Sequence, residues 1–570
     1  MQKVWLDSYP PGVAAEIDWN EFASVNEVLA RTCRQYPARP AFRNMGTTLT
    51  YREIDRYSRS FAAWLQRESG LHAGSRVALM LPNLLQYPIA LFGVLRAGMI
   101  AVNVNPLYTA RELEHQLKDS GAEAIVILEN FAHVLESVLD RTSLRRVVTT
   151  EAGDMLRPAP RRWWVNAAVK HVKKMVPDWR IAGARNWRGI LRSGEKLPLE
   201  EARPAHADTA LLQYTGGTTG AAKGAILSHG NLVANMLQGR EWARNFITES
   251  QETIITALPL YHIFSLTVNC LMFMERAALN VLITNPRDMK TFVKELQKTR
   301  FTIITGVNTL YNGLMRTPGF ERIDFRPLKL ALGGGAAIQP AVAERWRALT
   351  GKNVVEGYGL TETSPLVACN LLDAGYSGMI GLPMPSTNVI LLNEEDREVP
   401  VGEKGEICVS GPQVMQGYWR CPEATRNAIA PGGWLRTGDI GVMNERGFLQ
   451  VTDRKKDMIL VSGFNVYPNE VESVIGAVPG VVECAVIGVP DPVTGEAVKA
   501  LVVRSSETLT SDEVLANCRQ HLTSYKVPKM VEFRSELPKN PIGKVLRREL
   551  RAAEREKQSQ PASARHPDAA

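Results

Sequence analysis

The chain has 570 residues, enough for several domains with large buried cores, and its 45% hydrophobic and 22% charged residues are typical of a globular protein. Seven scattered cysteines without a C-x-x-C pair argue against a disulfide framework and a zinc module, and favour a reducing cytoplasm. The chain starts without an apolar stretch of signal-peptide length, and no run reaches the ~18 apolar residues of a membrane span. We therefore expect a soluble protein.

The net charge of +8 is unevenly spread, because residues 157–188 hold nine Lys and Arg residues against one acidic residue, Asp178. Within this basic segment the lysines avoid one apolar helical face, which comprises Val165, Ala168, Val169, Val172 and Val176. The pattern is typical of a helix that rests on anionic lipid, although a solvated helix packed on the body of the protein explains it too. A nucleic-acid role is disfavoured, since no recognised binding module accompanies the charge.

The first half of the chain alternates helical and strand patterns. Residues 49–66 repeat apolar side chains with the period of a helix. Short apolar runs with the character of buried strands stand at 75–81, 122–128, 253–260 and 301–307. Strands that alternate with helices predict parallel α/β layers.

Beyond residue 380 the pattern changes to short strands separated by Gly and Pro turns, which predicts a small β subdomain. The charged stretch DRKKD at 453–457 leads into a compact α/β unit, with strands near VECAVIGV and VKALVVR and a helix over SDEVLANCRQHL. The end of the chain, EKQSQPASARHPDAA, is polar and rich in Ala and Pro, so we expect it to be disordered.

Residues 213–225, QYTGGTTGAAKGA, have the composition of a phosphate-binding loop. Glycines let backbone N–H groups approach a ligand, threonines add hydroxyl donors, and Lys223 supplies positive charge. The loop is not the common P-loop, because Lys223 follows Ala222 and precedes Gly224. Taken alone, a flexible surface linker would explain the same composition.

Five further motifs follow this loop in the chain: LPLYHIF (258–264), GYGLTETSP (357–365), GWLRTGDIG (433–441), DRKKDMILVSGFNVYPNEVE (453–472) and PKNPIGKVLRREL (538–550). With the loop they stand in the order of the adenylate-forming superfamily, which includes acyl-CoA synthetases, luciferases and peptide-synthetase adenylation domains. The stretches NLLQYPIALFGVLRAGMIAVNVNPLYTARELEHQLKDSGA and VSGFNVYPNEVE resemble bacterial long-chain fatty-acyl-CoA synthetases. The resemblance spans nearly the whole chain, except the end and much of residues 157–200.

This resemblance implies an α/β fold with a large N-terminal domain of two α/β subdomains and a small β-barrel subdomain, followed by a small mobile α+β C-terminal domain. The implied boundaries are an AMP-binding domain at 1–452, a hinge at 453–456, a C-terminal domain at 457–552 and a disordered tail at 553–570. It also implies a reaction in which a carboxylate and ATP form acyl-AMP and pyrophosphate, before the thiol of coenzyme A displaces AMP.

The resemblance places the ATP-binding residues at Thr215, Gly216, Gly217, Thr218, Thr219, Gly220, Lys223, Gly334, Tyr358, Gly359, Thr361, Asp439, Arg454 and Lys456. Tyr358 would stack on adenine, Thr361 would bond the α-phosphate, and Asp439 would accept both ribose hydroxyls, with Arg454 beside it. Thr215 and Glu362 would hold Mg²⁺, a cation that prefers oxygen ligands and bridges phosphates. In isolation, Glu362 could be a surface residue of a turn, and the aspartate of T-G-D could cap a turn.

Lys544 is the residue expected to assist adenylation, because an ammonium between the carboxylate and the α-phosphate lowers their repulsion. Lys456 stands at the expected hinge, and Gly463, Phe464 and Asn465 would line the coenzyme A channel after the C-terminal domain rotates. His262 would orient the acid or gate its entry. Where some relatives have a tryptophan gate, this chain has Leu266, so such a gate cannot be transferred.

The sequence thus predicts an ATP- and Mg²⁺-dependent long-chain fatty acid–CoA ligase that uses coenzyme A as co-substrate. Three alternatives stay open: a ligase for medium-chain or aryl acids, an acyl-AMP ligase that loads a carrier protein, and a non-catalytic nucleotide-binding protein at the membrane surface. We expect a cytoplasmic protein that contacts the inner face of the cell membrane reversibly through 157–188 and binds no nucleic acid. A homodimer is one possible oligomeric state.

Overall fold

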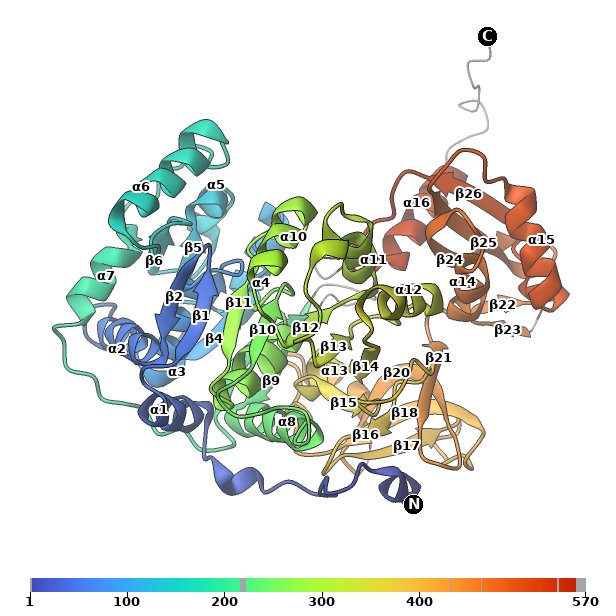
Figure 1. The fold of residues 1–570 in the computed structure, drawn as a ribbon, viewed down its shortest axis with the longest axis horizontal. Coiled ribbons are helices and arrows are strands. Elements are labelled where there is room, and N and C mark those ends of the chain that lie inside the picture. Colours follow the sequence, from blue (N-terminus) through green and yellow to red (C-terminus); the bar gives the residue numbers. More distant parts are fainter. Residues whose placement is uncertain (1–2, 216–221, 431, 463, 541–542, 560–570) are drawn as a thin grey trace, which may run out of the picture.

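The computed structural model describes residues 3–215, 222–430, 432–462, 464–540 and 543–559 (Figure 1). The sixteen α-helices of this part are α1 Val25–Gln35, α2 Tyr51–Arg67, α3 Gln86–Arg96, α4 Ala110–Ser120, α5 Ala132–Glu136, α6 Ala159–Ala167, α7 Trp187–Gly194, α8 His229–Trp242, α9 Phe273–Glu275, α10 Met289–Lys298, α11 Asn308–Arg316, α12 Pro340–Thr350, α13 Pro422–Ala428, α14 Pro468–Gly476, α15 Ser511–His521 and α16 Arg547–Ser559. They cover four sheets, of which two form the core of the N-terminal part.

The first large sheet has seven strands in the order β7-β6-β5-β3-β4-β8-β9. Its strands are β3 Arg76–Met80, β4 Ile100–Asn103, β5 Ala124–Leu128, β6 Arg146–Thr150, β7 Arg185–Asn186, β8 Thr209–Thr215 and β9 Lys223–Ser228. All neighbours pair in parallel except β8 and β9, which form an antiparallel hairpin. Parallel strands buried on both faces explain why the apolar runs of the sequence are continuous rather than alternating.

The second large sheet has nine strands in the order β16-β15-β14-β13-β12-β10-β11-β1-β2. Its strands are β1 Pro40–Asn44, β2 Thr47–Thr50, β10 Thr253–Thr256, β11 Leu279–Leu282, β12 Ile303–Gly306, β13 Leu330–Gly333, β14 Val354–Gly359, β15 Leu366–Cys369 and β16 Leu382–Pro383. The six strands from β1 to β14 in this order pair in parallel. This sheet delivers the GYGLTETSP motif at the end of β14.

Helices α2 and α3 pack closely against each other, and local sequence features explain both the start of α2 and this packing. A capping box of Thr50 and Glu53 starts α2, whose periodic apolar residues are buried. All of α3 is buried, and Gly93 lets it approach α2, because a Cβ there would lie 2.6 Å from the ring of Phe61. Close helix packing therefore requires glycine at this crossing.

The remaining two sheets have five strands each. One is the β subdomain, with β17 Asn388–Leu392, β18 Lys404–Ser410, β19 Ile429–Ala430, β20 Trp434–Met443 and β21 Leu449–Arg454. The other belongs to the C-terminal unit and has β22 Ile459–Val461, β23 Phe464–Val466, β24 Val481–Asp491, β25 Gly495–Arg504 and β26 Met530–Arg534. The fold class is thus confirmed: two α/β sheets, a β subdomain and a small C-terminal unit.

The C-terminal unit lies beside α11 and α12, at the end of the molecule opposite α6 and α7 (Figure 1). A Cβ at Gly543 would lie 2.5 Å from Oγ1 of Thr309, and Asn312 reaches the carbonyl of Val482. The first contact places Gly543, the residue before Lys544, against the start of α11, and the second joins α11 to β24.

The predicted disorder from residue 553 differs from the structure, in which α16 continues to Ser559. Glu554 accepts a hydrogen bond from the buried Lys499 at 2.7 Å, and Lys557 pairs with Glu532 at 3.2 Å. These ion pairs tie the helix to β25 and β26, a tertiary contribution that composition does not reveal.

In the basic segment, α6 is followed by a π-helix, Ala168–Val172. Val165, Ala168 and Val169 are half-buried against the body, as the amphipathic pattern predicts, but Val172 is 78% exposed. Trp163 and Trp164 are 71% and 76% exposed. The segment therefore packs on the protein and also presents apolar side chains outward. Across the described parts of the chain, no helix is both long and apolar enough to span a bilayer.

Candidate active site

Asp439, Arg454 and Tyr358 form the centre of the site. The pairing of β20 with β21 places Asp439 opposite Arg454, whose Nε lies 3.0 Å from Oδ1 of Asp439. The hydroxyl of Tyr358, from β14, donates to Oδ2 of Asp439 at 2.6 Å. Burial and the Asp439 carboxylate raise the pKa of Tyr358 well above its usual value, so the phenol stays protonated and keeps donating.

Arg454 keeps its charge although it is largely withdrawn from water. Burial is the largest single influence and opposes that charge, but the Asp439 carboxylate together with Tyr358, Asp457 and Glu362 outweighs it and raises the pKa of Arg454. A buried carboxylate that is held by one arginine and one phenol is rigid, and it retains acceptor capacity for hydroxyl groups of a ligand.

Lys544 enters the same region from the C-terminal unit. Its backbone N–H donates to Oδ1 of Asn540 at 2.8 Å, and Gly543 before it takes the left-handed conformation with φ of 85°. Burial lowers the pKa of Lys544 to about 8, and Arg454 adds to the drop while Asp439 opposes it. These interactions join Lys544 to the pair at the centre of the site.

His262 follows β10 in the LPLYHIF motif and faces the same lysine. Burial, and then the charge of Lys544, lower the pKa of His262 to about 4. Its Nδ1 accepts from the backbone N–H of Phe264 at 3.3 Å, which leaves the ring neutral at physiological pH. The structure therefore brings together four predicted residues from distant parts of the chain: His262, Asp439, Arg454 and Lys544.

Glu362 and Lys223 meet at Tyr418, a residue that the sequence analysis missed. The Tyr418 hydroxyl donates to Oε1 of Glu362 at 2.7 Å, and Nζ of Lys223 lies 5.5 Å from the centre of its ring. Burial and Glu362 raise the pKa of Tyr418. The signal that could have found Tyr418 is weak: a Gly-Tyr-Trp turn whose bridge to Ala225 appears only in the folded chain.

The predicted phosphate loop connects β8 to β9. Thr215 ends β8 and is the partner of Lys223 in the hairpin, so both ends of the loop are held by strand pairing. Five of its predicted residues lie outside the described part of the structure: Gly216, Gly217, Thr218, Thr219 and Gly220.

Close backbone approaches explain the glycines of the other motifs. A Cβ at Gly359 would lie 1.9 Å from the carbonyl oxygen of Pro365, and one at Gly334 would lie 3.0 Å from the ring of Phe264. Gly359 therefore cannot be replaced without a backbone shift. Thr361 begins the short 3₁₀ turn Thr361–Thr363, two residues after Gly359.

Two of the expected coenzyme A residues lie elsewhere. Phe464 and Asn465 are exposed on β23, at the edge of the C-terminal sheet, where the ring of Phe464 stacks on Tyr525 at 4.9 Å. Gly463 is outside the described residues. Lys456 lies in the turn after β21, and burial together with Arg454 lowers its pKa.

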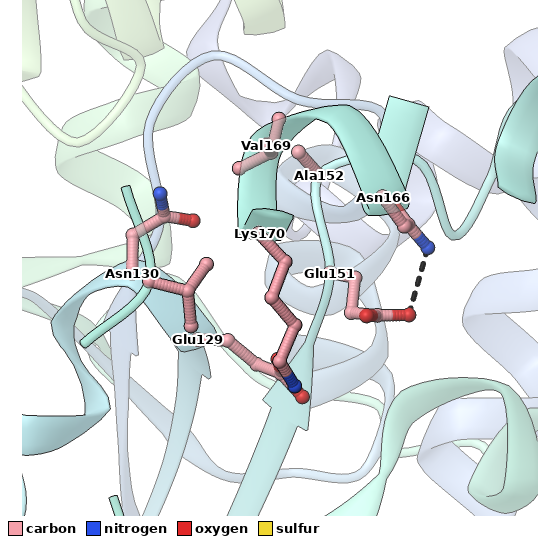
Figure 2. A pocket seen from close by; sticks show the side chains of 8 residues that line it. Glu129, Asn130, Glu151, Ala152, Asn166, Val169 and Lys170 are labelled. Atoms are coloured by element: carbon pink, nitrogen blue, oxygen red, sulfur yellow. Dashed lines mark hydrogen bonds between the residues drawn. The ribbon is translucent and has the colours of Figure 1, made fainter. Parts of the chain in front are cut away.

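A small surface pocket lies under the basic segment and shares no residue with this site. Figure 2 shows Lys170 extending toward Glu129 and Glu151, and Asn166 donating to Glu151 at 2.7 Å. The Asn166–Glu151 hydrogen bond holds the segment on the body of the protein. Among the described residues, no group of three or more His, Cys, Asp and Glu side chains is arranged to hold a metal ion. The acceptor-only carboxylate of Glu362 fits Mg²⁺, which proteins bind through one or two carboxylates when phosphates and water supply other ligands.

The chain matches two family models. Residues 29–419 match the AMP-binding enzyme model, and residues 470–544 match the AMP-binding enzyme C-terminal domain. Relatives named long-chain-fatty-acid–CoA ligase from Yersinia pestis and from Escherichia coli O6:H1 are 55% and 54% identical, each over 97% of this chain and 98% of the relative.

Solved structures support the same assignment. ATP-bound MatB from Rhodopseudomonas palustris is 30% identical with a TM-score of 0.79, and covers 93% of this chain and 99% of its own. An anthranilate CoA ligase in complex with anthranoyl-AMP, at 24% identity and a TM-score of 0.84 over 95% of this chain and all of its own, shows the fold alone. On these matches, which cover the N-terminal and C-terminal parts alike, the chain belongs to the AMP-binding enzyme family.

Proposed function

We propose that this protein is an AMP-forming long-chain fatty acid–CoA ligase. The observation that carries the proposal is the identity of 55% over 97% of the chain to a relative of that name. Retention of a half-buried, ionisable Lys544 that interacts electrostatically with Asp439 and Arg454 supports a catalytic protein over a nucleotide-binding one, because binding alone does not require that lysine.

In the first step, a fatty acid carboxylate oxygen attacks the α-phosphorus of ATP, the bond from that phosphorus to the pyrophosphate oxygen breaks, and pyrophosphate leaves. Asp439 accepts the ribose hydroxyls, with Tyr358 and Arg454 holding its carboxylate in place. With a pKa of about 8, Lys544 is mostly protonated at pH 7, and its ammonium stabilises the charge that gathers between carboxylate and phosphate. Neutral His262 beside it orients the acid without adding charge.

Thr215 and Glu362 would hold Mg²⁺. The ion would supply charge neutralisation on the phosphate oxygens. Tyr418 fixes the Glu362 carboxylate through its hydroxyl, and Lys223 at the end of the predicted phosphate loop adds a second cation on this side of the site.

In the second step, the sulfur of coenzyme A attacks the acyl carbon, the bond from that carbon to the AMP oxygen breaks, and AMP leaves. We place the hinge at 453–456, between an N-terminal domain at 1–452 and a C-terminal domain from 457. Rotation about Lys456 would withdraw Lys544 and bring Phe464 and Asn465 to the channel, since both are exposed here and remote from the cluster around Asp439.

For the basic segment we propose reversible contact with anionic lipid at the inner face of the cell membrane. Its support is the outward side chains of Trp163, Trp164, Val172 and Met175 among basic residues, at the end of the molecule away from the C-terminal unit. A homodimer stays a prediction, which light scattering after size exclusion would check.

The test is AMP release from ATP with Mg²⁺ and acids from acetate to oleate plus benzoate, with and without coenzyme A. Turnover that depends on coenzyme A and peaks on long chains is the expected result. Highest turnover with medium-chain or aryl acids would assign the protein to that substrate class instead, and acyl-AMP that accumulates regardless of coenzyme A would favour a carrier-loading enzyme. No AMP release with any acid would overturn the proposal.

A further inference from the structure

Arg547 occupies the centre of a buried polar cluster at the junction between the β subdomain and the C-terminal unit. It is the first residue of α16 and stands three positions after Lys544. Its Nη2 donates to Glu472 at 2.7 Å and to Asn469 at 2.6 Å. Its Nη1 lies 3.5 Å from the carboxylates of Asp453 and Asp457.

The acceptors of Arg547 fall on both sides of the proposed hinge. Asp453 is the first residue of the proposed hinge and lies on β21 of the β subdomain, whereas Asp457, Asn469 and Glu472 follow Lys456. Asp453 also accepts from the backbone N–H of Asn469 at 2.7 Å, so it joins β21 directly to α14. In this arrangement the Asp453 side chain is completely buried, at 0% exposure.

The segment between this cluster and Lys544 is short and braced. Leu546 donates its backbone N–H to Pro538 at 2.8 Å, and Val545 bridges Lys539. Asn540 holds the other side through the backbone of Lys544. A movement of Arg547 is therefore transmitted to Lys544, because the chain between them has little freedom.

We propose that Arg547 is a positioning residue for acyl-AMP formation: by neutralising the carboxylates that the closed hinge buries, it holds the C-terminal unit where Lys544 reaches the site. The inference rests on the proposed function, since it assumes that Lys544 serves the first half-reaction. It goes further in assigning Arg547 to one half-reaction and in naming Asp453 as the partner across the hinge.

Electrostatics gives this role a signature that a purely structural role lacks. Burial raises the pKa of Asp453 to about 6, although Arg547 opposes the rise, so the carboxylate is ionised and buried at pH 8. Without Arg547 that charge is uncompensated in the closed arrangement, which is costly. Protonation of Asp453 at lower pH removes the charge, so the loss caused by replacing Arg547 shrinks as the pH falls.

Other charged and titratable groups also face the cluster, and they are the same in the parent protein and in an Arg547 variant. They are Arg454 on β21, Lys456 in the turn, Tyr467 and Glu472 at α14, Cys484 on β24, and Lys544 and Arg551 around α16. Of these, Arg551 provides a matched control. It pairs with Asp457 at 2.7 Å, and both residues follow Lys456, so this ion pair does not cross the hinge.

The experiment separates the half-reactions in Arg547→Gln, Arg551→Gln and Lys544→Ala. At pH 8 we expect acyl-AMP formation by Arg547→Gln to fall about tenfold or more, while thioester formation from pre-made acyl-AMP changes less than about twofold. Arg551→Gln should affect both steps equally and weakly. Lys544→Ala must lose acyl-AMP formation for the assumed role to hold. If it does and Arg547→Gln does not, the positioning role is refuted while the proposed function stands.

A second variant addresses misfolding of Arg547→Gln. Adding Asp453→Asn removes the uncompensated charge and keeps an oxygen that accepts from Asn469. The double variant should regain acyl-AMP formation at pH 8, and the loss in Arg547→Gln alone should be smaller at pH 6 than at pH 8. No recovery, or an equal loss at both pH values, overturns the inference.

Discussion

Lys544 should impose an upper pH limit on acyl-AMP formation. Its pKa is lowered from 10.5 to about 8, mainly by burial and then by the charge of Arg454, a drop that corresponds to about 3 kcal/mol against the charged form. The ammonium, which stabilises the transition state, is therefore lost as the pH rises through 8. From pH 7 to pH 9 its population falls about tenfold.

The assay is single-turnover acyl-AMP formation without coenzyme A, so that the thiol of coenzyme A does not titrate in the same range. The rate constant at limiting substrate, which reports the free enzyme, should fall as the pH rises through about 8. At saturating substrate the fall should move to higher pH, because bound phosphates favour the ammonium. His262 does not add a limb between pH 6 and 9, since its pKa is about 4.

One variant and one control reaction make the assignment specific. Lys544→Arg keeps its charge throughout this range, so whatever activity it retains should be flat to pH 9. In the unmodified protein, the rate of thioester formation from pre-made acyl-AMP should not fall near pH 8. The reasoning is refuted if the rate of acyl-AMP formation by the wild type is constant up to pH 9.5, or if its fall near pH 8 is unchanged in Lys544→Arg.

Three further predictions concern other parts of the chain. Tyr418→Phe removes the hydroxyl that donates to Glu362 at 2.7 Å, so the Mg²⁺ concentration for half-maximal activity should rise several-fold in a Mg²⁺ titration, with thermal stability little changed. Gly359→Ala places a Cβ 1.9 Å from a carbonyl oxygen, so both the melting temperature and ATP affinity by calorimetry should fall; an unchanged ATP affinity would contradict the backbone argument. Replacing the exposed Trp163 and Trp164 by serine should weaken binding to anionic vesicles in flotation assays, and binding by the parent should weaken in high salt. Vesicle binding that ignores both changes would remove the proposed lipid contact.

Local patterns predicted the α/β layers and the β subdomain, whereas the residues at the centre of the site were predicted from the resemblance that the ordered motifs carry. The strand patterns and helical periods of the first half need only short windows, and the T-G-D and D-R motifs lie on two strands that pair as neighbours, which places Asp439 opposite Arg454. The same methods failed where tertiary contacts decide. Residues 553–559 are helical because Glu554 and Lys557 find partners on β25 and β26.

Long-range polar contacts were the other gap. Tyr418 lies 56 residues from Glu362, and no local pattern marks it as the donor to that carboxylate. Nor does the sequence indicate which outward side chains the basic segment presents. A helical wheel places Val172 on the packed face, but the π-helix that follows α6 changes the period, and Val172 turns outward.

Both the site and the hinge bury carboxylates, and an uncompensated buried charge would destabilise the fold. Asp439 is balanced by Arg454 within one hairpin, so its position does not depend on the C-terminal unit. Asp453 is balanced by Arg547, 94 residues away, and only while the two parts are closed. An ion pair inside one domain fixes a ligand site, whereas an ion pair across a hinge makes the closed state conditional. We therefore expect substitutions at Asp439 to weaken nucleotide binding in both half-reactions, that of ATP in the first and that of acyl-AMP in the second, whereas substitutions at Arg547 should impair only the first.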